Sequence, residues 1–264
     1  MQSSDLNTFK AWFTEYSQTF YTGDAEDNKN IELKVRHTSF VRENAVLIAG
    51  EEHLDDNNVL IAETAALFHD VGRFAQYATY KTFRDNISVN HGRLGAEILR
   101  EKDILTHLPA VEQELIINTV KFHNTFEVPP FGDQRKILFL RLIRDADKLD
   151  IWRIFAEYCH SPEDDQASAV GLGLPDRTDY SHTILSCLHK KSLASLSDME
   201  TLNDFKLMQL SWVYDLNFRH SFRLLAERRL IHKIASTLPQ TEEIAAALAV
   251  VKEFVSEKSG LKRP

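Results

Sequence analysis

Histidines and aspartates that could bind metal ions recur along the first half of the chain. The stretch AALFHDVGRF, residues 65–74, places His69 and Asp70 side by side at the end of an apolar run. One such pair is expected about once by chance in a chain with 11 histidines, so the pair alone is a weak motif. Whether the pair binds a metal ion depends on further candidate ligands elsewhere in the chain. The candidates are His37, His91, His123 and the acids of RDADKLD, residues 144–150.

Imidazole and carboxylate ligands together suit Mn, Fe, Co, Ni or Zn, and the absence of nearby thiols argues against a structural cysteine–zinc site. Taken singly, each residue has an ordinary structural alternative. His37 could be a core histidine, His123 could be a cation that a helix C-terminus favours, and Asp147 could be a solvated acid. The series as a whole predicts a metal centre, which could lower the pKa of a bound water and neutralise charge on a phosphoryl oxygen.

The elements that must position these residues are predicted to be helices. Only 9 glycines and 7 prolines interrupt the chain, and no period-two alternation or hairpin turn occurs, so we expect an all-α fold. Asn90 is an expected N-cap for a helix that begins at His91. Loops are expected over 78–89 and 161–179. The expected helices cover 6–16, 35–53, 59–68, 91–102, 109–123, 133–151, 180–190, 201–217, 218–237 and 241–257.

Each candidate ligand lies on a different expected helix or at its end, which is how helical bundles build metal sites. We expect residues 1–264 to form a single all-α domain, because a chain of 264 residues can bury one large core.

Composition excludes several classes of protein. The net charge of −8 argues against a nucleic-acid polymer as a partner, although a local basic pocket for a small anion stays open. Cys159 and Cys187 do not form a disulfide framework, which favours a reducing, cytoplasmic setting. The first residues lack the pattern of a signal peptide, and no apolar run of about 18 residues predicts a membrane span. We therefore expect a cytoplasmic protein without a membrane partner, and a homo-oligomer stays open.

The ordered series resembles the HD superfamily of metal-dependent phosphohydrolases. In that family a lone histidine, a His-Asp pair and a distal aspartate follow one another, as His37, His69-Asp70 and Asp147 do here. Residues 146–149, ADKL, match the usual context of the distal aspartate, and Asp145 competes with Asp147 for this place. The segments HDVGRF, NHGRLGAEIL and VKFHN also resemble family motifs. The resemblance covers an HD core of about residues 30–160, and the helical extension of about 180–260 has no counterpart.

The resemblance implies a set of metal ligands. His37, His69, Asp70 and Asp147 would hold one ion, and His91 and His123 would complete a six-ligand site in which Asp70 bridges two ions. The alternative is a single ion, with His91 and His123 contacting substrate. The expected cofactors are divalent ions, two in number, with Fe, Mn, Co or Ni ahead of structural Zn.

The implied activity is hydrolysis of a small phosphate ester or nucleotide by a metal-activated water. Asp70 and Arg73 are the expected catalytic residues, and Arg73, Lys81 and Arg84 are the expected substrate-binding cations. Arg73 could equally be a surface arginine paired with an acid, and the other two could belong to a solvated loop.

Two other functions stay open, and a third is disfavoured. A di-iron oxygenase of the myo-inositol oxygenase type would use the same six ligand types. A non-catalytic helical binding module would keep the metal for stability. Hydrolysis of cyclic-di-GMP is disfavoured, because the stretch NTFEVPPFGDQ after His123 lacks the Gly-Tyr-Pro signature of the proteins that perform it.

Overall fold

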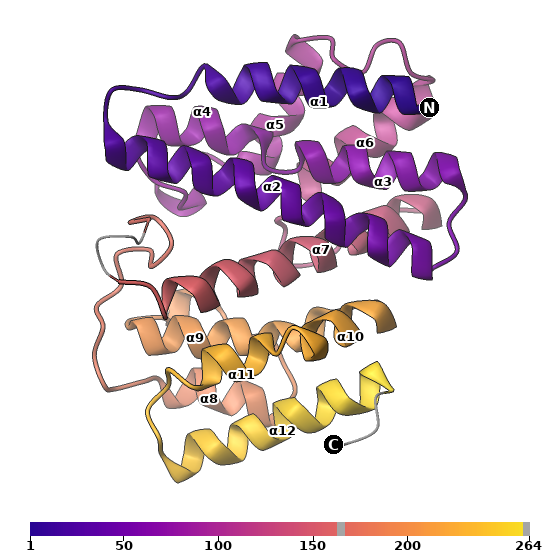
Figure 1. The fold of residues 1–264 in the computed structure, drawn as a ribbon. Coiled ribbons are helices and arrows are strands. Elements are labelled where there is room, and N and C mark those ends of the chain that lie inside the picture. Colours follow the sequence, from indigo (N-terminus) through magenta and orange to yellow (C-terminus); the bar gives the residue numbers. More distant parts are fainter. Residues whose placement is uncertain (163–166, 261–264) are drawn as a thin grey trace. The chain divides into compact units, whose positions relative to one another are not determined.

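The computed structural model describes residues 1–162 and 167–260. These described residues form α-helices and short 3-10 turns with no strand among them, which confirms the all-α prediction (Figure 1). The chain divides into two compact units, Met1–Asp150 and Ile151–Pro264. The division falls earlier than the expected end of the HD core near residue 160.

The first unit contains the whole ligand series. In this unit α2 packs against α3, α4 against α5, and α5 against α6. Its last helix, α7, begins in the first unit and ends in the second. The helices are α1 (Ser3–Gln18), α2 (Ala25–Glu51), α3 (Asp56–Phe68), α4 (Val71–Tyr80), α5 (His91–Glu101), α6 (Ala110–Phe122) and α7 (Gln134–Tyr158).

Side-chain caps fix where several of these helices begin. The Asn90 side chain accepts a hydrogen bond from the backbone N–H of Arg93, which confirms it as the N-cap of α5 and places His91 in the first turn. Asp24 caps α2 in the same way, and Asp55 caps α3. The start of α2 at Ala25 is earlier than expected, and it brings Lys34 onto the same helix as His37.

The His-Asp pair lies at the junction of two helices. His69 is the C-cap of α3, and Asp70 is the N-cap of α4. The loop expected from residue 78 therefore begins later, because α4 continues to Tyr80 and ends at Lys81, whose φ of 52° is left-handed.

The second unit is also helical. A single helix was expected over 218–237, but the chain breaks it at Arg229, whose φ of 54° is left-handed. The helix expected over 201–217 ends at Ser211 and continues as a 3-10 turn, Trp212–Asp215. The helices here are α8 (His182–His189), α9 (Leu202–Ser211), α10 (Arg219–Glu227), α11 (Leu230–Ala235) and α12 (Glu242–Ser259). Within the described part of the chain, no helix is long and apolar enough to span a membrane.

Candidate metal centre

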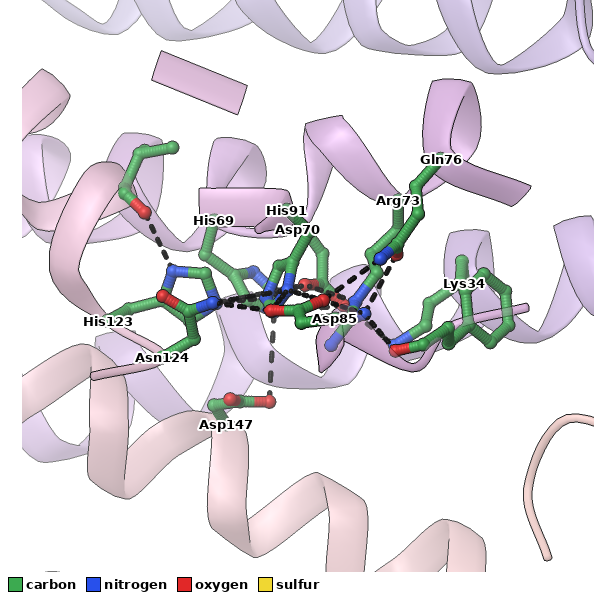
Figure 2. A network of polar contacts seen from close by, with 12 residues as sticks. Lys34, His69, Asp70, Arg73, Gln76, Asp85, His91, His123, Asn124 and Asp147 are labelled. Carbon is green, nitrogen blue, oxygen red and sulfur yellow. Dashed lines mark hydrogen bonds and ion pairs between the residues drawn. The ribbon is translucent and has the colours of Figure 1, made fainter. Parts of the chain in front are cut away.

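The six predicted ligands converge on one cluster in the first unit, and Figure 2 labels all of them except His37. They come from α2, from the α3–α4 junction, from the start of α5, from the end of α6 and from α7. The four histidines and Asp70 are buried, whereas the side chain of Asp147 is 18% exposed. Burial matters because water is excluded from the ligand atoms, which strengthens their attraction for a cation. The members are His37, His69, Asp70, His91, His123 and Asp147.

The donor atoms fall into two groups. In the first, His37 Nε2 lies 3.1 Å from His69 Nε2 and 3.1 Å from Asp147 Oδ1. In the second, His91 Nε2 lies 3.0 Å from His123 Nε2. We call these the His37 group and the His91 group.

Asp70 contributes one oxygen to each group. Its Oδ2 lies 3.5 Å from His37 Nε2, and its Oδ1 lies 3.2 Å from His91 Nε2. A carboxylate placed in this way can bridge two cations, one through each oxygen.

Two of the histidines are oriented by helix ends. His69 Nδ1 lies 2.7 Å from the carbonyl oxygen of Ala66, and His123 Nδ1 lies 2.8 Å from that of Val120. Both histidines are C-caps, where the carbonyls of the last turn lack a backbone partner. A carbonyl only accepts hydrogen bonds, so each Nδ1 carries its hydrogen and each neutral ring presents a bare Nε2 to the cluster.

The other two histidines are oriented by carboxylates. His37 Nδ1 lies 2.7 Å from Asp150 Oδ2, and His91 Nδ1 lies 2.8 Å from Asp85 Oδ2. Asn124 Nδ2 in turn donates to Asp85 at 2.8 Å. Such outer partners fix the ring orientation of metal-binding histidines and raise their basicity.

This donor set fits a divalent cation. Nε2 lone pairs that face one another at 3.1 Å and 3.0 Å would repel unless a proton or a cation lies between them. Donors that lie 3.0–3.8 Å apart can share one ion, because metal–ligand bonds are about 2.0–2.2 Å long. The structure therefore supports a buried His/Asp cluster that could hold metal ions.

Asp70 stays ionised in this setting. Burial alone would raise the pKa of its carboxyl, but the Lys34 ammonium at 2.7 Å and the neighbouring His69 outweigh burial, so this pKa is held well below its ordinary value. An ionised carboxylate is the form that can bind cations.

The predicted substrate cations lie in different settings. Arg73 Nη1 donates to Gln76 Oε1 at 2.8 Å and to Asp85 Oδ1 at 2.9 Å, so it belongs to the network around His91. Lys81 forms an ion pair with Asp27, and its side chain is 55% exposed. Arg84 is exposed. Their roles toward a substrate stay predictions.

The structure places Asp147 in the cluster, whereas Asp145 is buried but belongs to neither donor group. Sequence reasoning included Asp150 only as one of the candidate acids of residues 144–150, and it assigned no role in the site to Lys34. Each had a local signal, because Lys34 lies three residues before His37 and Asp150 three residues after Asp147, one helical turn in each case.

Comparison with known families is consistent with this geometry. Residues 35–152 match the HD domain, a superfamily that consists mostly of metal-dependent hydrolases. Residues 35–152 therefore carry an HD domain, which confirms the resemblance noted in the sequence. Comparisons with curated proteins and with solved structures yield no significant match.

Replacing Asp150 with asparagine should weaken metal binding at the His37 group by about 10–100-fold, because His37 loses its carboxylate partner. Calorimetric titration of the metal-free protein would measure this affinity. Asp103→Asn changes an exposed carboxylate and should bind metal as the unaltered protein does. Equal affinities in the two variants would contradict the orienting role of Asp150.

Without metal, stability should be greatest near pH 6.5. Burial lowers the pKa of His69 to about 4 and of His91 to about 3, so between these values and 6.5 the unfolded chain binds more protons. The free energy of unfolding should therefore fall on acidification, by on the order of 2 kcal/mol at pH 5.

The contribution of His37 to the free energy of unfolding changes with pH in the opposite direction. Burial and Lys34 disfavour its charged form, but the hydrogen bonds that the His37 ring donates to Asp147 and Asp150 outweigh them and raise its pKa to about 9. Its contribution is fully present below pH 6.5 and is lost as the pH rises through about 9. Urea unfolding in the presence of a chelator at pH 5, 6.5 and 9 tests both the acidic and the basic loss of stability. A free energy of unfolding that is the same at all three pH values would contradict both predictions.

Proposed function

We propose that this protein is a metal-dependent phosphohydrolase that cleaves a small phosphate ester or a nucleotide. The observation that carries the proposal is the pair of donor groups that share the Asp70 carboxylate. Two cations close together form a clamp that suits in-line displacement at phosphorus.

The chain's own residues define where ions would bind. The His37 group, with Asp70 Oδ2, offers His37, His69 and Asp147, and the His91 group, with Asp70 Oδ1, offers His91 and His123. Divalent ions there would acidify a water molecule and neutralise the charge that develops on phosphoryl oxygens. The protein supplies the rest by holding the rings through their Nδ1 atoms and by excluding bulk water.

The charges at the cluster favour a dianionic substrate. The carboxylates that touch it exceed the cationic side chains by two charges when the histidines are neutral. With two divalent ions the balance becomes two positive charges, which the dianion of a phosphomonoester would neutralise. The carboxylates are Asp70, Asp85, Asp147 and Asp150, and the cations are Lys34 and Arg73.

The test begins with the metal content per chain of protein purified anaerobically without added metal. The protein is then loaded separately with Mn, Fe, Co and Ni and is assayed for phosphate release from phosphomonoesters, nucleotides and cyclic dinucleotides. We expect about two ions per chain and release from at least one monoester. Folded, metal-loaded protein that releases phosphate from no substrate would refute the proposal.

A di-iron oxygenase is the second candidate, and the complete set of six histidine and aspartate donors is the observation that favours it. The same preparation distinguishes the two activities. Iron at two equivalents per chain, with oxygen consumption and no phosphate release, would identify the oxygenase. Metal that raises the melting temperature without any turnover would indicate a binding module.

A further inference from the structure

Lys34 is a cation at the cluster that the ligand series does not include. It lies on α2, one turn before His37, and its Nζ is 2.7 Å from Asp70 Oδ2 (Figure 2). Its side chain is 14% exposed, compared with 4% for Asp70, so the lysine side chain is more accessible to solvent than the shared carboxylate.

The ammonium is held in place but keeps spare donors. Its Nζ lies 5.0 Å from the centre of the Phe83 ring, a cation–π contact that fixes its direction. Within the described residues, its hydrogen bond goes to Asp70. A lysine ammonium has three N–H groups, so it can donate to further oxygen atoms while this contact persists.

The other cations near the cluster are less available. Arg73 Nε lies 3.5 Å from Asp70 Oδ1, but its Nη1 is engaged by Gln76 and Asp85. Replacing Arg73 would therefore also disturb the support of His91 by Asp85. Lys81 is paired with Asp27 at the surface. Lys34 is therefore the cation beside Asp70 that can be replaced without removing the Arg73 hydrogen bonds to Gln76 and Asp85.

We propose that Lys34 anchors the phosphate group of the substrate by donating hydrogen bonds to a phosphoryl oxygen. This inference rests on the proposed function, because it assigns a residue to bind the phosphate of that substrate. A point charge with rotatable donors suits a phosphate that exchanges contacts during hydrolysis. This role also explains why Asp70, a buried carboxylate that could bind cations, is in contact with the Lys34 ammonium.

The experiment measures binding of inorganic phosphate to the manganese-loaded protein by calorimetry, so that it does not depend on turnover. The variants are Lys34→Met, which keeps the length of the side chain, and Lys34→Arg, which keeps the charge. Lys10→Met is the matched control, because it removes a lysine charge that is paired with Glu63, a carboxylate outside the ligand series. Metal content per chain is measured for every variant.

Lys34→Met should bind phosphate at least about tenfold more weakly, with unchanged or tighter manganese binding, because one positive charge near the ions is gone. Lys34→Arg should retain most of the affinity, and Lys10→Met all of it. If Lys34→Met does not fold, Lys34→Gln replaces it.

Phosphate binding by Lys34→Met at the unaltered affinity would overturn the inference. A loss of manganese would overturn it too, because Lys34 would then hold Asp70 for the metal rather than the substrate. The two proposals can fail separately. If the protein hydrolyses no phosphate ester but Lys34→Met still binds phosphate more weakly, the proposed function is wrong and the role of Lys34 in binding phosphate is upheld.

Discussion

Replacing Asp70 with asparagine should remove both metal ions and lower phosphate release by at least about 10³-fold. The reason is that each oxygen of this carboxylate faces a different donor group, so one substitution affects both. An amide cannot offer two anionic oxygens. Elemental analysis and the rate of phosphate release, measured on the same sample, check the two parts of this result.

The control for Asp70→Asn is Asp103→Asn. Asp103 is exposed and has a φ of 51°, a left-handed conformation that asparagine tolerates, so the fold should be unaffected. We expect wild-type metal content and rate for this control. Asp70→Asn protein that retains two ions, or that hydrolyses substrate within tenfold of the unaltered rate, would show that the carboxylate is not shared.

Replacing Gly72 with alanine should destabilise the protein by about 3 kcal/mol or more. A Cβ at this position would lie 2.3 Å from the carbonyl oxygen of His91 and 2.7 Å from the backbone nitrogen of Gly95. Both neighbours are backbone atoms of α5, so relief requires α4 and α5 to move apart. Because His91 begins α5, the same movement should weaken metal binding at the His91 group.

Gly50→Ala is the matched control, because a Cβ at Gly50 would meet no atom within 4 Å. Gly50 is exposed in α2, so alanine there should leave stability unchanged or raise it by up to about 1 kcal/mol. Urea unfolding compares the two variants under the same conditions. If Gly72→Ala unfolds with the same free energy as Gly50→Ala, the close approach of α4 and α5 is not a constraint.

The sequence by itself determined the all-α class, most helix positions and the order of the candidate ligands. These properties depend on local patterns, because the helical repeat and the capping residues act within one or two turns. Asn90 illustrates this, since its cap requires only the backbone three residues ahead. The order of histidines and aspartates was also sufficient to indicate the HD superfamily.

Local patterns were insufficient where a helix could present either of two faces. Asp145 and Asp147 lie two residues apart, which is about 200° around an α-helix, so they point to different sides. The packing of α7 in the first unit decides that Asp147 meets the histidines, although Asp145 is the more buried of the two. Sequence spacing alone holds no information about that rotation.

Only the tertiary structure decided how the ligands are supported. The contacts of Lys34 with Asp70 and of His37 with Asp150 join residues 36 and 113 positions apart. The division of the donors into two groups, with one Asp70 oxygen in each, likewise requires five segments of the first unit to meet. These features depend on where separate helices are brought together by burial of their apolar faces, which is set by the packing of the whole unit.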